Sequence, residues 1–148
     1  MRGIDAPGGR QMRTTAIVLL ACALHSLIVG SAIAGNAAPG KTEHPANVAL
    51  IKDDTGWKYV HFPSNVRLYV FDGDSSGKSA CNLGCDGAWP PLLVGNNEKP
   101  LGDWTIIVRY DGSRQWAYLG HPVYGRFHDS VEEPSGNGID GAWHFLEP

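Results

Sequence analysis

The chain has 148 residues, of which 43% are hydrophobic and 18% are charged, with a formal net charge of −3, 19 glycines and 10 prolines. This apolar content excludes wholesale disorder, and the glycine and proline content disfavours a helical bundle. Without an excess of basic residues, nucleic acid is not an expected partner. The composition describes one small folded domain and indicates no reaction.

The first 34 residues have the pattern of a secretory signal peptide. Arginines precede an uncharged, mostly apolar run over residues 14–34, which ends in Ala32-Ile33-Ala34. Small residues at positions −3 and −1 are typical of a cleavage site. We therefore expect cleavage after Ala34 and a periplasmic or secreted bacterial protein.

Two further features belong to this N-terminal region. Leu19-Leu20-Ala21-Cys22 resembles a lipobox, so in the competing interpretation Cys22 carries a lipid. Only in that case do we expect contact with a membrane. Residues 35–47 read as a flexible leader that precedes the folded domain.

The first half of the domain reads as three strands and a loop. Residues 48–52 and 57–61 form two strands joined by the turn Asp53-Asp54-Thr55-Gly56. A third strand covers residues 66–71. The loop 72–88 is rich in Gly, Ser, Asp and Asn, which favour turns.

The second half shows the same order of elements. Residues 105–110 are β-branched and aromatic, Asp111-Gly112 is a hairpin signal, and residues 114–119 return. Residues 123–127 form a shorter third strand, and 128–142 form a second polar loop. Neither half has a convincing helical period, so we expect a mostly β protein.

Four landmarks recur in the same order about 55 residues further along the chain. They are Trp57-x-Tyr59 and Trp116-x-Tyr118, Leu68-Tyr69 and Val123-Tyr124, Asp74 and Asp129, and Asp86-Gly87-Ala88-Trp89 and Asp140-Gly141-Ala142-Trp143. We therefore predict an all-β domain over residues 48–148, made of two tandem β-meander repeats over about 48–93 and about 103–146. The two repeats pack around a shared aromatic-rich core, in which the tryptophans fill equivalent holes. The expected members of this repeat core are Trp57, Tyr69, Trp89, Trp104, Trp116, Tyr124 and Trp143.

Further motifs extend this pattern. They are Tyr69-Val70-Phe71-Asp72-Gly73-Asp74, Cys81-x3-Cys85, Trp89-Pro90-Pro91-Leu92 and Gln115-Trp116-Ala117-Tyr118. Together they resemble a bacterial family of secreted repeats, or predicted lipoproteins, with a Tyr-x-(Phe/Trp/Tyr)-x-x-Asp signature. The second copy departs from this signature, because Arg126 stands where an aromatic is expected and Phe127 follows one residue late, which predicts a bulged strand.

The resemblance implies an exported envelope protein with no established molecular function. It also implies a faint association of some relatives with alkane catabolism, and it supplies no catalytic residues.

Cys81 and Cys85 are the strongest chemical signal. In an oxidising compartment, two cysteines four positions apart on a glycine-containing loop predict a structural disulfide that shapes the surrounding loop. The alternative is an accessory redox or copper-handling protein that uses this pair. Binuclear copper sites with this cysteine spacing also use a histidine and a methionine, but here Trp89 and Leu92 stand at those two positions.

Asp72, Asp74 and Ser76 form a candidate binding loop. With Gly77 they fill the first positions of an EF-type calcium loop, but Leu83 stands where a bidentate glutamate is needed. We therefore predict no metal site and no cofactor. A calcium site of another kind and a solvated turn are both compatible with this loop.

The sequence contains no catalytic motif. Histidines such as His61, His121 and His144 are scattered, and G-x-S-x-G is absent. We therefore expect a non-enzymatic binding or structural module whose partner is an unknown envelope component or a small ligand. A hydrolase would require a serine, a histidine and an acid that meet in space.

Overall fold

The structure is a computed structural model that describes residues 43–148. Its regular elements are mostly short strands in small antiparallel sheets, so the all-β prediction is confirmed. The predicted signal peptide, the alternative lipid site at Cys22 and the leader up to residue 42 lie outside the described residues. None of the helices within residues 43–148 has the length and apolar character needed to span a bilayer.

Two β-hairpins contain most of the strand residues. β1 (Val48–Asp53) pairs with β2 (Gly56–His61), and β4 (Trp104–Val108) pairs with β5 (Arg114–Tyr118). The other edge of β5 pairs with β6 (His121–Pro122). The hairpin strands lie close to their predicted ranges because apolar and aromatic residues are bounded there by clear turn signals.

An aspartate closes the turn of each hairpin. Asp53 accepts hydrogen bonds from the hydroxyl and the backbone N–H of Thr55, both at 2.8 Å. Asp111 accepts the same two bonds from Ser113, at 2.6 and 2.9 Å. These bonds favour the charged carboxylate, so the pKa of each aspartate lies below its usual value.

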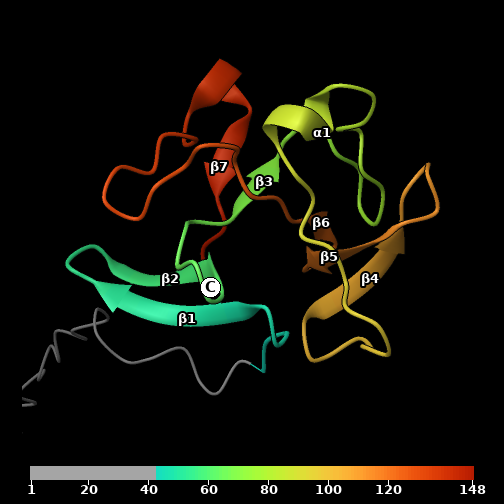
Figure 1. The fold of residues 1–148 in the computed structure, drawn as a ribbon, viewed down its shortest axis with the longest axis horizontal. Coiled ribbons are helices and arrows are strands. Elements are labelled where there is room, and N and C mark those ends of the chain that lie inside the picture. Colours follow the sequence, from blue (N-terminus) through green and yellow to red (C-terminus); the bar gives the residue numbers. More distant parts are fainter. Residues whose placement is uncertain (1–42) are drawn as a thin grey trace, which may run out of the picture. The chain divides into compact units, whose positions relative to one another are not determined.

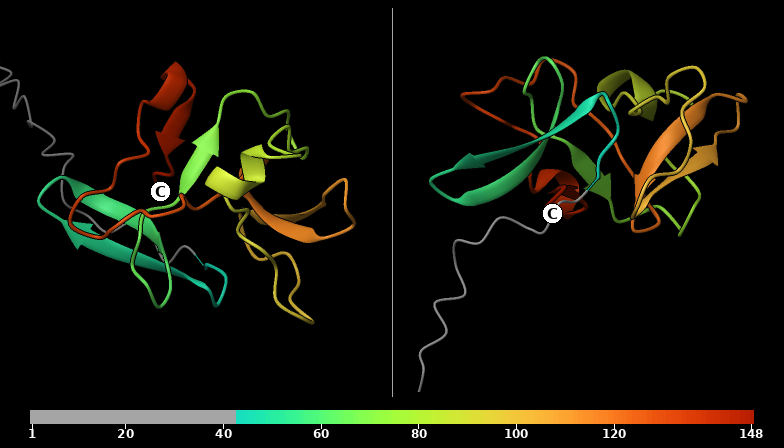
Figure 2. Two further views of the ribbon diagram at one scale, coloured as in Figure 1. Left: turned by 45° about the horizontal axis from the view of Figure 1, so that its top comes forward. Right: turned by 90° about the horizontal axis from the view of Figure 1, so that it is seen from below.

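The third strand of the first half differs from its prediction. β3 (Tyr69–Phe71) is shorter than the expected 66–71 and pairs with β7 (Trp143–Phe145), not with its own hairpin. The views in Figures 1 and 2 place this pair between the two hairpins. The predicted strand over 123–127 makes only isolated bridges. The first half is therefore not a self-contained meander.

Two one-turn helices lie in the loops, where no helix was predicted. α1 (Cys85–Ala88) and the 3-10 turn η1 (Ile139–Gly141) both contain the start of the Asp-Gly-Ala-Trp motif. A glycine with positive φ precedes each turn, at 106° for Gly84 and 82° for Gly138, which side chains disfavour. A single helical turn has no hydrophobic period, so periodicity cannot reveal it.

Backbone hydrogen bonds cross between the two halves in matched pairs. Tyr69 and Tyr124 exchange N–H···O bonds, both at 2.9 Å. The other pairs again match residues about 55 positions apart. In the first of these pairs, the Leu92 N–H donates to the Val123 carbonyl and the Leu146 N–H donates to the Leu68 carbonyl. In the second, the Phe127 N–H donates to the Ala88 carbonyl and the Asp72 N–H donates to the Ala142 carbonyl.

Two further backbone hydrogen bonds, one within each half, correct one predicted correspondence between the halves. The carbonyl of Tyr59 accepts from the Leu68 N–H, as the carbonyl of Trp116 accepts from the Val123 N–H. Tyr59, rather than Trp57, therefore occupies the place that matches Trp116. Trp57 is only partly buried, whereas Trp116 is buried.

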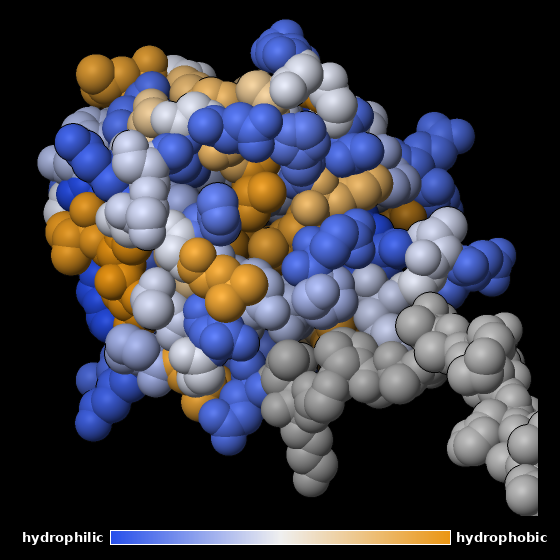
Figure 3. Space-filling model, turned by 180° about the vertical axis from the view of Figure 1, so that it is seen from behind, coloured by the Kyte–Doolittle hydropathy of each residue, from blue (hydrophilic) through white to orange (hydrophobic). Residues whose placement is uncertain are grey.

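The buried side chains form two clusters. Their members are Val48, Tyr59, Leu68, Leu92, Trp104, Trp116, Tyr118, Val123 and Leu146 in the first, and Tyr69, Cys81, Trp89, Tyr124 and Trp143 in the second. Aromatic rings of the first cluster meet edge-on or tilted, with centroids between 5.0 and 6.4 Å apart. On the face seen in Figure 3, apolar side chains form several groups separated by polar ones.

Candidate functional site

The signature tyrosines bond to the signature aspartates of the opposite half. The Tyr69 hydroxyl donates to Asp129 at 2.5 Å, and the Tyr124 hydroxyl donates to Asp74 at 2.8 Å. Each aspartate also accepts a bond at 2.7 Å from the backbone N–H six residues further on. Burial raises the pKa of both tyrosines well above the usual value. The signature therefore joins the two halves instead of forming one site in each.

A buried polar network extends from Tyr124. Its hydroxyl lies 2.7 Å from the Ser79 hydroxyl, which accepts a hydrogen bond from Arg109 at 3.1 Å. Arg109 is 5% exposed and also donates to the Gln115 side chain at 2.7 Å and the Cys81 carbonyl at 2.9 Å. A guanidinium tolerates such burial only where several acceptors surround it. These bonds tie the second hairpin to the loop that follows β3.

The two tryptophans of the Asp-Gly-Ala-Trp motif stack on each other. The ring centroids of Trp89 and Trp143 are 3.7 Å apart, and their planes differ by 2°. Phe71 stacks on Trp143 at 4.5 Å, and the Arg126 guanidinium lies 5.1 Å from the Trp89 centroid. Arg126 thus stands over Trp89 as Phe71 stands over Trp143. Residue 126 belongs to no strand, so the predicted bulge does not occur.

Cys81 and Cys85 are bonded to each other, with their Cα atoms 5.1 Å apart. Cys81 is buried in the second cluster, and Cys85 packs against it. Ile139, which precedes the second Asp-Gly-Ala-Trp motif as Cys85 precedes the first, packs against the same cluster. The half-cystine therefore fills space that an aliphatic side chain fills in the other half.

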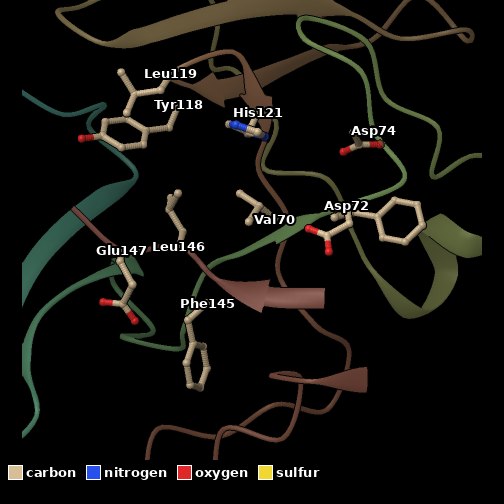
Figure 4. Close-up of a pocket in the computed structure, with 10 residues that line it drawn as sticks. Val70, Asp72, Asp74, Tyr118, Leu119, His121, Phe145, Leu146 and Glu147 are labelled. Carbon is tan, nitrogen blue, oxygen red and sulfur yellow. The ribbon is translucent and has the colours of Figure 1, made fainter. Parts of the chain in front are cut away.

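The candidate binding loop contributes to a hollow of about 340 Å³, to which Asp72 and Asp74 belong and Ser76 does not. Figure 4 shows Val70 and Leu146 in the middle, with the two aspartates to one side and Glu147 to the other. The remaining lining residues of this acidic hollow are Phe71, Tyr118, Leu119, His121 and Phe145. No lysine or arginine of the described residues lines it.

The carboxylates of the acidic hollow have different partners. Asp72 lies 2.9 Å from the His144 imidazole, and Glu147 accepts a bond from Arg67 at 2.9 Å. Within residues 43–148, one carboxylate oxygen of each remains without a hydrogen-bond partner. Burial raises the pKa of Asp74, while its bonds from a backbone N–H and a tyrosine hydroxyl oppose the rise.

A second hollow has a volume of about 350 Å³ and a mostly apolar lining. We call it the apolar hollow, and its lining is Asn47, His61, Val66, Leu68, Pro90, Pro91, Leu92, Leu93, Gly125 and Arg126. Leu92 and Arg126 line it where Leu146 and Phe71 line the acidic hollow. No aspartate or glutamate of the described residues lines it.

The histidines do not complete a catalytic arrangement in the described part of the chain. His61 lies 2.9 Å from the Ser64 hydroxyl, and His144 lies 2.9 Å from Asp72. No hydrogen-bonded chain within residues 43–148 joins a serine, a histidine and a carboxylate. Over the same residues, no three His, Cys, Asp or Glu side chains gather closely enough to hold a metal ion. The expectation of a non-enzymatic protein stays a prediction.

No sequence pattern singled out the buried network of Ser79, Arg109 and Gln115. Its signal is weak, because Arg109 directly follows an apolar strand and Gln115 directly precedes a tryptophan. A charged or amide side chain at an inward position indicates a buried partner only when the direction of the strand is known.

Comparison with known proteins found one match. No curated protein and no solved structure matches the chain. A family model matches residues 105–147, a segment that runs from β4 to just beyond β7 and contains both Tyr124 and Asp129. The predicted resemblance is confirmed over this segment. Residues 105–147 match the model of a family described as a secreted repeat of unknown function.

Proposed function

We propose that this protein is an exported, non-enzymatic binding module built from two copies of one unit. The crossed bonds Tyr69–Asp129 and Tyr124–Asp74 carry the proposal, because they assign the signature residues to the scaffold. Ligand recognition then falls to the residues that line the two hollows. The description of the matched family as secreted supports the export.

The acidic hollow has the chemistry to bind a small organic ammonium ion. The free oxygen of either Asp72 or Glu147 can accept a bond from the ammonium group, and Val70 and Leu146 offer an apolar surface for its body. Its volume of about 340 Å³ falls in the lower range of small-molecule sites, which is about 300–1,000 Å³.

Titration of the ¹⁵N-labelled protein with benzylamine, followed by amide chemical shifts, tests this function. We expect saturable shifts at Val70 and Leu146, and weaker binding of uncharged benzyl alcohol. Glu147→Gln should weaken benzylamine binding, whereas Glu133→Gln, an equal charge change at an exposed loop position, should not. If benzylamine gives no saturable shifts, the acidic hollow is not a binding site for organic ammonium ions.

A further inference from the structure

Arg126 is a partly buried cation in the segment that follows β6. Its guanidinium lies over the Trp89 ring, and it forms no hydrogen bond or ion pair through its side chain with any of residues 43–148. A guanidinium carries five N–H donors in a planar fork. Among residues 43–148, none of these donors has a hydrogen-bond acceptor.

The fold does not require a cation at this position. Phe71 covers Trp143 at the matching place in the other half, with centroids 4.5 Å apart. Stacking of an aromatic ring and packing of a guanidinium on an indole are interactions of similar strength. The ring also avoids the desolvation of a charge. The presence of arginine over Trp89 thus needs a reason other than packing.

The surroundings of Arg126 supply that reason. Arg126 lines the apolar hollow, whose volume is about 350 Å³, together with side chains that include Leu68, Leu92 and Leu93. No carboxylate of the described residues lines this hollow, so nothing there neutralises the guanidinium. An apolar cavity lined by an arginine that has no ion-pair partner among residues 43–148 favours a molecule with an apolar body and one anionic end.

We propose that the apolar hollow binds a small monocarboxylate with an apolar body, whose carboxylate pairs with Arg126. This inference rests on the proposed function as a binding module, and it adds a second site with the opposite charge preference. The planar fork of arginine matches the two oxygens of a carboxylate, which a lysine cannot reproduce. The apolar body would lie against Leu68 and Leu92.

The test is a titration of the ¹⁵N-labelled protein with hexanoate at neutral pH, followed by amide chemical shifts. We expect saturable shifts at Leu68, Leu92 and Arg126. Acetate keeps the charge without the apolar body, and hexan-1-ol keeps the body without the charge. Both should bind at least about tenfold more weakly than hexanoate, because each lacks one of the two interactions.

Arg126→Phe is the decisive variant, because it places at position 126 the residue type that stands at position 71. It should fold with an unchanged melting temperature, lose hexanoate binding by at least about tenfold and still bind hexan-1-ol. Arg126→Lys should bind hexanoate with intermediate affinity. If Arg126→Phe fails to fold, Arg126→Gln serves in its place.

Three results would overturn the inference. One is hexanoate binding to Arg126→Phe or Arg126→Gln that equals wild-type binding. Another is equal binding of hexan-1-ol and hexanoate by the wild type, and the third is the absence of hexanoate binding. If hexanoate fails while benzylamine binds the acidic hollow, this inference is wrong and the proposed function stands.

Discussion

Replacing Tyr124 by phenylalanine removes one hydroxyl group and keeps the ring, so it tests the hydrogen bonds of this hydroxyl without changing the packing of the ring. That hydroxyl lies 2.8 Å from the Asp74 carboxylate and 2.7 Å from the Ser79 hydroxyl, in a residue that is 0% exposed. Hydrogen bonds to charged groups contribute about 1.5–3 kcal/mol. We therefore expect Tyr124→Phe to lower the free energy of unfolding by about 2 kcal/mol.

Urea denaturation followed by tryptophan fluorescence measures this loss. Tyr69→Phe should give a loss of similar size, because its hydroxyl makes the matching bond to Asp129. Tyr110→Phe is the control, since Tyr110 is 57% exposed and its substitution should change stability by less than about 0.5 kcal/mol. If Tyr124→Phe is as stable as Tyr110→Phe, the crossed bonds do not hold the halves together.

The loss should also depend on pH, through Asp74. Burial raises the folded-state pKa of Asp74 above its usual 3.8, so the native state binds this proton more tightly than the unfolded chain. The resulting stabilisation is fully present below pH 3.8 and is lost as the pH rises through the folded-state pKa. Without the Tyr124 hydroxyl, the charged Asp74 carboxylate lacks one hydrogen-bond donor. The loss of unfolding free energy caused by Tyr124→Phe should therefore be larger at pH 7, where Asp74 is charged, than at low pH.

Three further substitutions test other parts of the structure. Asp111→Asn should reduce the acid sensitivity of the melting temperature, because the lowered pKa of Asp111 gives stability that is present above pH 3.8 and lost as the pH falls through the folded-state value. The double variant Cys81→Ala/Cys85→Ala should lose about 2 kcal/mol in urea denaturation, since its loop, with a sequence separation of 4, restricts little chain entropy; a loss of all structure would contradict this. Gly136→Ala should lose about 1–3 kcal/mol in thermal unfolding, because an added Cβ overlaps the Tyr69 ring.

The hairpins and the aromatic core were predictable because their signals are local. Asp53 and Asp111 stand in turn sequences between apolar runs, and both close the turns that the sequence indicated. The burial of Trp104 and Trp116 follows from large apolar rings in strands of a small domain. None of these features depends on which distant segments pair.

The pairing of β3 with β7 was not predictable from the same signals. A hydrophobic pattern shows which face of a strand is buried, but it does not name the strand at its edge. Two similar halves can pair within each half or exchange strands, and the sequence pattern is the same in both cases. The exchange also pairs Asp74, which the sequence placed in a candidate binding loop, with Tyr124, while Asp74 still lines the acidic hollow.

Comparing the two halves distinguishes the residues that hold the fold together from the residues that we propose select a ligand. Where the halves bond to each other, both present tyrosine, aspartate and tryptophan. Where they line the hollows, two matched positions differ in charge, with Phe71 matched by Arg126 and Glu147 matched by Leu93. Both hollows rest on one framework, so the fold cannot be what demands an acid in one and a cation in the other. Under the proposed two-copy construction, differences of this kind are where ligand selection resides, which makes Arg126 and Glu147 more informative targets than the signature residues.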